Sequence, residues 1–414
     1  MKNPRRVLII VENLPVPFDR RVWAEATTLC EAGYEVSVIS PMMKGFTAPY
    51  EAIDGVHVYR HPLSEAGSGG GYLREYAGAL WHQFRLALKV RRERGFDVIH
   101  ACNPPDLIFI VAAFFKFFFG VRFIFDHHDL CPELYEAKFG RKGFMHGALL
   151  ALERATFALA DVSIATNESY RGLALARGGM KADRVFVVRS GPRLDRMVIR
   201  SGDPALKRGR RFLVGYVGVI GKQEGLDLLV GAVAHLVNHV GRTDAHFAVI
   251  GDGPELQSVK ALATEKGVAG YMDFYGRVDD ALFLDALNTS DVCVNADRAC
   301  AMNDLSTMNK ILEYMALGKP IVQFETTEGR RSAGAASLYA RPDNVADFAL
   351  KIDMLLSDPQ LRRDMGALGR ERVLTQFSWA HSVPALLRAY EKTFERPAPV
   401  SLPRPRASAA PAGE

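Results

Sequence analysis

The segment with the most chemistry in this 414-residue sequence is NDLSTMNKILEYMALGKPIVQFE, residues 303–325. It opens with side chains that commonly cap helices and continues with strong helix formers up to Gly318, after which Pro320 starts an apolar run. This order predicts a helix that begins near Thr307, followed by a buried strand.

The start of that helix is a candidate anion site. Free backbone N–H groups and the positive end of the helix dipole attract anions, and Lys310 adds a cation suited to a diphosphate. Glu313 lies about two turns beyond Ser306, far enough from the anion to bind a ribose diol. An ordinary capped helix with a solvated lysine and glutamate explains the same residues equally well, so both interpretations stand.

A second polar cluster, FDHHDLCPE at residues 125–133, follows a predicted strand. Asp126, His127, His128 and Asp129 are adjacent, and side chains of an extended chain alternate between two faces, so the four cannot converge on one ion. We therefore expect no metal there. The open alternatives are a histidine that faces a ligand cleft, with His128 preferred over His127, and a histidine bonded within a turn.

Two further groups have both a functional and an ordinary interpretation. Asp19, Arg20 and Arg21 follow the first predicted strand, where they either bind a phosphate group or cap a helix and face solvent. His235 and His239 have the i, i+4 spacing of a zinc pair, but the residues between them lack the glutamate of HExxH. We expect that pair to lie on an exposed helix face.

Short apolar runs of strand length alternate with helical patterns along the chain, which predicts βαβ units in parallel, doubly wound sheets. Strands are expected at residues 6–11, 35–39, 56–60, 97–101, 122–126, 162–166 and 185–189, and again at 212–217, 247–250, 272–275, 292–295 and 320–324. Helices of the second series are expected at residues 226–240, 255–266 and 308–317.

The alternation pauses in a basic segment with Pro and Gly, residues 191–211, which predicts a linker between domains. A chain of 414 residues also favours two cores over one. We expect an α/β protein with Rossmann-like domains at residues 1–190 and 212–377, whose strands point their carboxyl ends at one shared cleft. Residues 396–414 are rich in Pro, Ala and Ser and are expected to be disordered.

The composition, 48% hydrophobic and 24% charged, is that of a folded globular protein. A net charge of +5 and a pI near 8.9 suit an anionic partner, such as a phosphate-bearing substrate or a membrane surface, without indicating nucleic acid. Five cysteines without a CxxC pair predict neither disulfides nor a zinc ribbon and fit a reducing cytoplasm. No signal peptide is expected, because the first apolar run is short and lacks a cleavage site.

Two stretches of the sequence are candidates for membrane contact. Residues 107–125 are the most apolar, but a lysine, a glycine and an arginine interrupt them, so a helix, a turn and a buried strand are expected there instead of a membrane span. Residues 72–94 have the pattern of a basic amphipathic helix with an interfacial Trp81. Peripheral membrane contact and packing on the core are equal alternatives for that helix.

Four motifs occur in the order and spacing of one known family. They are VENLPVPFDRRVWAEATTLCEAGYEVSVIS at residues 11–40, GDGPE at 251–255, FYGRV at 274–278 and EYMALGKPIV at 313–322. The sequence thereby resembles the family 4 glycosyltransferases of the GT-B fold over residues 5–395. The opening motif is similar to the branch that transfers N-acetylated amino sugars during surface-polysaccharide assembly, for O-antigen, capsule or exopolysaccharide.

That resemblance implies a nucleotide sugar, with UDP expected, bound on the C-terminal domain. The donor-binding residues that it implies are Gly251, Gly253, Arg277, Val278, Asp304, Ser306, Thr307, Asn309 and Glu313. Within this set Glu313 binds the ribose and Arg277-Val278 contacts the base. The resemblance also implies that His128 contacts the sugar or stabilises charge at its anomeric carbon, and that residues 19–21 face the acceptor or a phosphate. A helix at 378–395 is expected to cross back to the N-terminal domain.

The loop at residues 215–225, GYVGVIGKQEG, departs from the family pattern. Val219 and Glu224 stand where the family has an arginine and a lysine for the diphosphate. We expect Lys222 and Lys310 to replace them.

A second departure concerns the donor sugar. The family has two glutamates eight positions apart, and Leu305 stands at the first position when Glu313 is the second. Either Asp304 or the backbone N–H groups of residues 305 and 306 are expected to contact the sugar.

The implied reaction is a retaining transfer that needs no metal and no dedicated base, because the departing phosphate takes the proton of the acceptor hydroxyl. A lipid-linked polysaccharide precursor is the expected acceptor, and the cytoplasm or the inner face of its membrane the expected location. The alternatives are a nucleotide-sugar 2-epimerase of the same fold and a non-catalytic nucleotide-sugar or carbohydrate-binding protein. An NAD-dependent dehydrogenase is disfavoured, since no GxGxxG follows the first strand.

Overall fold

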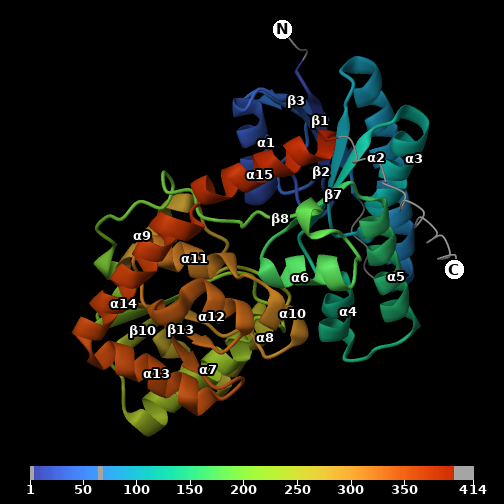
Figure 1. Ribbon diagram of the computed structural model, residues 1–414. Helices are drawn as coiled ribbons and strands as arrows, with labels where there is room; N and C mark the ends of the chain where they lie inside the picture. Colours follow the sequence, from blue (N-terminus) through green and yellow to red (C-terminus); the bar gives the residue numbers. More distant parts are fainter. Residues whose placement is uncertain (1–3, 64–68, 396–414) are drawn as a thin grey trace, which may run out of the picture.

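The structure is a computed structural model that describes residues 4–63 and 69–395, with the side chains of residues 69–76 excluded. Figure 1 shows two α/β lobes, one from each half of the chain, with the last helix lying across both. The tail predicted to be disordered, residues 396–414, lies outside the described residues.

The N-terminal domain is built on an eight-stranded sheet in the order β3-β4-β2-β1-β5-β6-β7-β8, in which only β3 is antiparallel to its neighbour. Its strands are β1 (Arg6–Ile10), β2 (Glu35–Met42), β3 (Tyr50–Ile53), β4 (Val56–Pro62), β5 (Val98–Cys102), β6 (Arg122–His127), β7 (Val162–Ala165) and β8 (Val185–Val187). The sequence pattern predicted all of these except β3, a four-residue strand at the sheet edge whose residues alternate between exposed and intermediate burial.

Helices cover both faces of this sheet, so its strands are apolar throughout. In β1, Val7 and Ile9 face a core shared with the first and last helices, while Leu8 and Ile10 face the core on the other side. The helical segments of this domain are α1 (Arg20–Glu31), α2 (Gly69–Glu93), η1 (Asp106–Ile108), α3 (Phe109–Phe119), α4 (Cys131–Phe139), α5 (Phe144–Leu159), α6 (Glu168–Ala176) and η2 (Ala182–Arg184).

The predicted linker, residues 191–211, lies between β8 and the second sheet and contains the short η3 (Pro204–Lys207). The second sheet is parallel throughout, in the order β11-β10-β9-β12-β13-β14. Its strands are β9 (Phe212–Val217), β10 (Ala245–Ile250), β11 (Met272–Gly276), β12 (Val292–Asn295), β13 (Ile321–Phe324) and β14 (Ser337–Ala340). The expected fold class, two doubly wound α/β domains, is confirmed.

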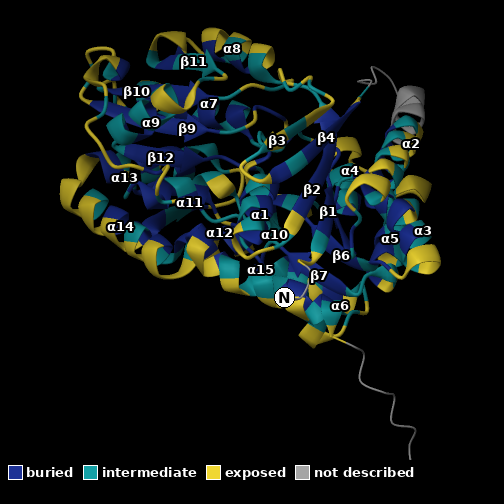
Figure 2. Ribbon diagram, turned by 90° about the horizontal axis from the view of Figure 1, so that it is seen from above, coloured by how far each residue is buried: buried dark blue, intermediate teal, exposed yellow. Residues whose placement is uncertain are grey.

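Helices again cover both faces of the second sheet, and Figure 2 shows buried strands between helices whose outer sides are exposed. The helical segments here are α7 (Leu226–His235), η4 (Leu236–Val240), α8 (Leu256–Glu265), η5 (Ala269–Tyr271), α9 (Asp280–Thr289), α10 (Ala301–Leu305), α11 (Asn309–Ala316), α12 (Thr327–Ala333), η6 (Gly334–Ala336), α13 (Val345–Ser357), α14 (Pro359–Arg372) and η7 (Val373–Phe377).

The last helix, α15 (Trp379–Phe394), leaves the C-terminal domain and packs into the core of the N-terminal domain (Figure 1). The Trp379 indole N–H donates to Thr28 Oγ1 over 3.0 Å, and the Tyr390 hydroxyl lies 2.7 Å from His100 Nδ1 inside the sheet. The two domains are therefore joined twice, by the linker and by this helix.

Both stretches that bear on membranes are folded against the N-terminal domain. Residues 107–125 form η1, α3 and part of β6, as expected from their interruptions. Leu80, Phe84, Leu86 and Leu88 of α2 pack against the domain core, which is the core-facing alternative for this helix. Within residues 4–63 and 69–395, no helix combines the length and the apolar character that crossing a bilayer requires.

Candidate active site

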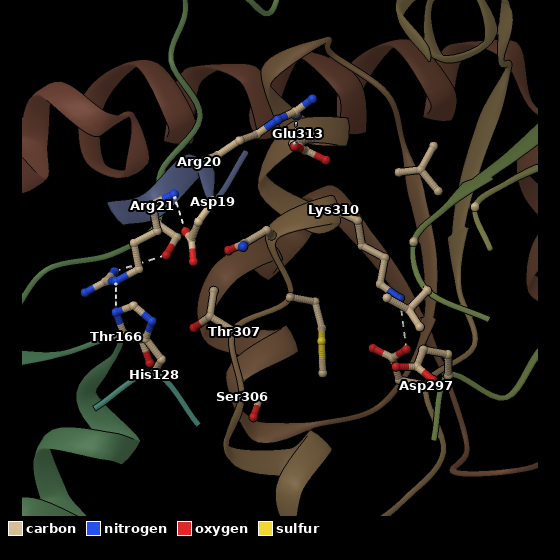
Figure 3. A pocket seen from close by; sticks show the side chains of 18 of the residues that line it. Asp19, Arg20, Arg21, His128, Thr166, Asp297, Ser306, Thr307, Lys310 and Glu313 are labelled. Carbon is tan, nitrogen blue, oxygen red and sulfur yellow. Dashed lines mark hydrogen bonds and ion pairs between the residues drawn. The ribbon is translucent and has the colours of Figure 1, made fainter. Parts of the chain in front are cut away.

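A cavity of about 590 Å³ lies between the carboxyl ends of the two sheets and is lined by both domains (Figure 3). The residues predicted from the sequence that line it are Asp19, Arg20, Arg21, His128, Gly251, Arg277, Val278, Ser306, Thr307, Asn309, Lys310 and Glu313. Most of the candidate residues thus lie around one cavity that both domains share.

Helix α11 begins at Asn309, two positions later than expected from its cap residues. The side chains that were expected to cap it bind the other domain instead: Ser306 Oγ lies 3.0 Å from the Tyr170 hydroxyl, and Thr307 Oγ1 accepts from Asn167 Nδ2 at 3.1 Å. Met308 takes the cap position without a side-chain hydrogen bond. The first N–H groups of α11 consequently remain available at the cavity.

Lys310 is buried in the first turn of α11 and is held by acidic and aromatic partners. Its Nζ lies 2.9 Å from Asp297 Oδ1 (Figure 3). The same Nζ lies 4.8 Å from the centre of the Tyr216 ring. Burial alone would lower the pKa of Lys310, but Asp297 outweighs burial and raises it, so the ammonium group stays charged. This lysine provides a fixed positive charge at the cavity wall.

The loop that departs from the family pattern places an acid, not a base, beside that lysine. Glu224 lines the cavity, where burial raises the pKa of its carboxyl group. Lys222 is exposed and is not among the lining residues, because residues 222–225 form a tight turn that leads into α7 and directs it outward. The structure does not bring Lys222 to the cavity with Lys310, so its expected role at the diphosphate stays a prediction that this geometry does not support.

Glu313 lies one turn further along α11 and meets Arg20 from the opposite domain. The distance between Glu313 Oε1 and Arg20 Nη1 is 3.5 Å, and Arg20 also donates to Asp280 Oδ1 at 2.9 Å. Burial raises the pKa of the Glu313 carboxyl group. The glutamate expected to bind a ribose is thus in the cleft and takes part in an ionic contact between the domains.

Asp304 does not face the cavity. Its carboxylate accepts from the backbone N–H and the hydroxyl of Thr327, at 2.8 and 2.9 Å, and so holds the start of α12. The other expected sugar contact, through the backbone N–H groups of residues 305 and 306, stays a prediction, since the Ser306 N–H donates to the Asn303 carbonyl at 3.4 Å. The structure does not bring Asp304 to the cavity.

Gly251 and Gly253 are required by the approach of two chain segments. A Cβ atom on Gly251, whose φ is +143°, would lie 1.7 Å from the carbonyl oxygen of Gly218, and one on Gly253 would lie 2.4 Å from that of Ile220. These glycines therefore let the loop after β10 approach the loop after β9. Of the two, Gly251 lines the cavity and Gly253 does not.

Arg277 and Val278 lie in the loop after β11 and line the same cavity. The Arg277 guanidinium stacks 4.1 Å from the centre of the Phe18 ring, which belongs to the N-terminal domain. The expected base-binding residues are thus at one end of the cleft, where both domains contribute.

On the N-terminal wall, His128 rests on a buried ionic network. Its Nε2 lies 2.5 Å from Asp126 Oδ2, and Arg21 donates to the same carboxylate through Nη2 at 2.9 Å. Burial alone would raise the pKa of Asp126, but Arg21 and His128 outweigh burial and hold it well below its usual range. The Nε–H of Arg21 also donates to His128 Nε2 at 2.9 Å, so this ring nitrogen is engaged by the network.

His127, the neighbour that was not preferred, points to the opposite side of β6. It is buried among the rings of Phe125, Phe157 and Tyr170, and its Nε2 lies 3.4 Å from Glu153. The preference for His128 as the cleft histidine agrees with this arrangement.

The Asp19-Arg20-Arg21 segment caps a helix and lines the cavity, and its binding of a phosphate group stays a prediction. Asp19 caps α1 by accepting from the N–H groups of Arg21 and Val22 at 3.1 Å. Arg21 is buried and bound to Asp126, to Glu25 and to the Val188 carbonyl, so it supports the wall of the cleft. Arg20 is the member of the three that reaches across the cleft.

Two groups of metal-type side chains lie elsewhere. Potential ligand atoms of Glu25, His100, Cys102 and Asp126 lie within 4.8 Å of one another, but Arg21 already supplies their positive charge. His235 and His239 pack ring to ring, 4.9 Å apart, on an outer helical segment. Neither group is part of the cavity.

Asp297 is a site residue that the sequence interpretation missed. It lies in the loop after β12, is almost fully buried, and is the counter-ion of Lys310. Asp297 follows a buried strand closely in the sequence, at the carboxyl end of the sheet, and this position could have identified it as a site residue.

Profiles of two known families match the chain. The family described as "Glycosyl transferase 4-like domain" matches residues 19–191, and the family "Glycosyl transferases group 1" matches residues 211–358. Each match covers one of the two domains that form the cleft.

Curated relatives agree with these profiles. The chain is 28% identical to 2-deoxystreptamine glucosyltransferase of Streptomyces kanamyceticus over 44% of this chain and 45% of the relative. It is 30% identical to lipopolysaccharide core biosynthesis glycosyltransferase LpsE of Rhizobium meliloti over 38% and 43%, and 26% identical to alpha-maltose-1-phosphate synthase of Mycolicibacterium smegmatis over 66% and 74%. The chain spans less than half the length of the first two relatives.

Solved structures share the fold. Sucrose-phosphate synthase from Thermosynechococcus elongatus superposes with a TM-score of 0.77 at 18% identity, covering 94% of this chain and 99% of that one. Anabaena HepE in complex with UDP-glucose does so with a TM-score of 0.68 at 14% identity, covering 93% and 99%. From the paired sheets, the crossing helix and the two profiles, the chain belongs to the group 1 glycosyltransferases of family 4, with the GT-B fold.

Proposed function

We propose that this protein is a retaining glycosyltransferase that moves a sugar from a nucleoside diphosphate sugar to an acceptor hydroxyl in the cavity. The observation that carries the proposal is the start of α11, where Lys310 and free backbone N–H groups face the cavity and Glu313 follows one turn later. A diphosphate and a ribose of one nucleotide match that spacing of cation and carboxylate.

Charge on the departing diphosphate is stabilised by groups that are already in place. The Lys310 ammonium group is buried, so its field is weakly screened, and its contact with Asp297 fixes its direction. The N–H groups at the start of α11 add donors to the same anion. These groups supply positive charge from the chain itself, and we propose that transfer needs no metal ion.

The chemical step is a substitution at the anomeric carbon on the face that the phosphate leaves. The acceptor oxygen forms the new bond to that carbon, the bond to the phosphate oxygen breaks, and the hydroxyl proton passes to the departing phosphate oxygen. His128 then contacts the sugar through Nδ1, while Asp126 and Arg21 hold its ring in place. The anomeric configuration is retained.

The finer identity of the substrates is also proposed. UDP is favoured because structures that share the fold include complexes with UDP-glucose, and an N-acetylated amino sugar is favoured by the resemblance of residues 11–40. A lipid-linked polysaccharide precursor, reached at the cytoplasmic face of a membrane, is the proposed acceptor. Residues 19–21 line the N-terminal side of the cavity, on which an acceptor approaches.

The test is release of nucleoside diphosphate from a panel of UDP-, GDP- and ADP-sugars in the presence of EDTA. We expect turnover with one UDP-sugar and its loss in Lys310→Ala and Glu313→Ala. Tight nucleotide binding without turnover, even with lipid extracts added as acceptor, would instead identify a binding protein. Conversion of the UDP-sugar to its C2 epimer without an acceptor would identify an epimerase.

A further inference from the structure

One side of the N-terminal domain has large apolar side chains that nothing in the described chain covers. Helices α2, α3 and α5 stand side by side at the edge of the molecule away from the C-terminal domain (Figures 1 and 2). The exposed fractions there are 59% for Trp81 of α2, 76% and 73% for Phe117 and Phe118 of α3, and 91% and 51% for Phe144 and Met145 of α5. We call these five residues the aromatic face.

Two residues of this face, Trp81 and Phe118, are connected across two helices by a row of rings that includes the partly buried Phe84 and Phe114. The ring centres of Trp81 and Phe84 are 6.4 Å apart, those of Phe84 and Phe114 are 4.9 Å apart, and those of Phe114 and Phe118 are 4.9 Å apart. Single exposed apolar residues are common on proteins, but a grouped set of large rings marks a surface that meets a partner.

Basic side chains lie on the same elements as these residues. Arg85 and Arg92 are exposed on α2, Lys138 is exposed at the end of α4, and Arg141 and Lys142 are exposed in the turn before α5. This turn lies in the sequence AKFGRKGFMHG, residues 137–147, which contains no acidic residue. Glu136, just before it, is the acid that pairs with Lys142, at 3.4 Å.

Rings next to basic groups, among which Lys142 has an acidic partner, fit the interface of an anionic bilayer. Aromatic side chains are favoured at the level of the lipid headgroups, and each lysine or arginine near the surface adds attraction to anionic lipids. A second copy of this chain fits less well, because a symmetric contact would bring the same basic residues against one another.

We propose that the aromatic face binds the surface of a membrane that contains anionic lipids, with its rings among the headgroups and its basic residues on lipid phosphates. Helix α2 contributes through Trp81 and its exposed arginines, while Leu80, Phe84, Leu86 and Leu88 pack against the domain core. Helix α4, which leads into the basic turn, also contacts α10 across the cleft. The bound membrane therefore lies next to the N-terminal side of the cavity.

The first experiment is co-sedimentation of the full chain with vesicles of phosphatidylcholine, with and without phosphatidylglycerol. We expect binding to the anionic vesicles at low salt, and at least about tenfold weaker binding to neutral vesicles or at high salt. The readout needs no substrate and no turnover, so it stands or fails independently of the proposed transfer reaction.

Variants locate the contact. F117S/F118S and F144S/M145S are each expected to weaken binding to anionic vesicles by about tenfold or more. R141Q/K142Q is expected to weaken it by about fivefold for each charge removed. The matched control is L350S/M354S, which removes two apolar residues of α13 that are 48% and 46% exposed in the other domain, and it should bind like the wild type.

Tryptophan emission gives a second readout on the folded protein. Trp81 is exposed, whereas Trp23 and Trp379 pack against the core of the N-terminal domain. Anionic vesicles are expected to shift the emission to shorter wavelength, and W81F should remove that shift.

The proposal is overturned if the wild type does not sediment with anionic vesicles at low salt, or if both aromatic double variants bind as well as L350S/M354S. It is also overturned if the wild type is a dimer that F117S/F118S converts to a monomer while vesicles bind neither. Because the substituted residues are exposed, all variants should keep the thermal unfolding midpoint of the wild type, which verifies that they are folded.

Discussion

Lys310 Nζ lies 2.9 Å from Asp297 Oδ1, so the buried lysine of the cleft has its own counter-ion within the same domain. A lysine without a partner would lose its proton more easily on burial, whereas this pair keeps the charge and fixes its position. A diphosphate that binds at the start of α11 therefore meets an ammonium group that is already oriented.

Lys310→Met should lower kcat by about a hundredfold or more, because it removes a fixed charge that acts on the departing diphosphate. Lys222→Met is the matched control, since Lys222 is exposed and outside the cavity, and its kcat should stay within about twofold of the wild type. Both values come from nucleotide release under saturating donor. Equal losses in the two variants would show that the loop at residues 215–225 also reaches the diphosphate.

Glu313→Gln should raise the Kd for UDP by about tenfold, because a charge-assisted hydrogen bond to the ribose is replaced by a neutral one. Glu325→Gln is the control, since Glu325 is an exposed carboxylate paired with Arg330 outside the cavity. Isothermal titration calorimetry measures both. Unchanged UDP affinity in Glu313→Gln would remove Glu313 from the nucleotide site.

Glu25→Gln should stabilise the protein at alkaline pH. Burial and the nearby Asp126 raise the pKa of Glu25 well above its usual range. A group with a raised pKa in the folded state gives stability that is present below its unfolded pKa and is lost as the pH rises through the folded pKa. Glutamine resembles the protonated carboxyl group, so the variant should avoid that loss and melt at least about 2 °C higher than the wild type at pH 9.

The control for Glu25 is another buried glutamate with the opposite shift. Burial alone would raise the pKa of Glu153, but His127 and Arg177 outweigh burial and lower it. Its contribution to stability is therefore present above the unfolded pKa and lost as the pH falls through the folded pKa. Glu153→Gln should destabilise the protein at pH 7, and a stabilising effect of this substitution would contradict the assigned network.

Gly251→Ala should destabilise the C-terminal domain by about 3 kcal/mol or more, since the added Cβ meets a backbone oxygen in a conformation that favours glycine. Gly270→Ala is the control, because a Cβ there meets nothing within 4 Å, and its effect should stay within about 0.5 kcal/mol. Denaturant unfolding measures both. A wild-type midpoint for Gly251→Ala would mean that the two loops can separate without cost.

The fold class and the cleft could be predicted from the sequence because most strands, though not β3 and β14, are local apolar runs, and candidates such as Gly251 and Arg277 lie just beyond one. Helix α11 shows where such prediction ends. Ser306 and Thr307 have the chemistry of cap residues, but their hydroxyls bind Tyr170 and Asn167, which lie in the other domain. A local pattern contains no information about partners more than a hundred positions away.

The same limit explains the residues that changed role. Asp304 has a carboxylate of the expected type, but this carboxylate accepts hydrogen bonds from Thr327. Lys222 has the expected charge, but the turn that contains it directs it outward. Asp297 was missed because its importance depends on Lys310, which approaches it from a separate helix.

Helix α15 ends the described chain and yet fills a gap between the sheet and α1 of the first domain. On the ribosome, the N-terminal domain emerges first, and its core lacks Leu386, Ala389 and Tyr390 until the end of the chain is made. Until then His100 also lacks its hydrogen-bond partner, the Tyr390 hydroxyl. Synthesis of the last helix therefore completes the core of the first domain. A chain cut short before α15 leaves the N-terminal domain, which is made first, with an incomplete core.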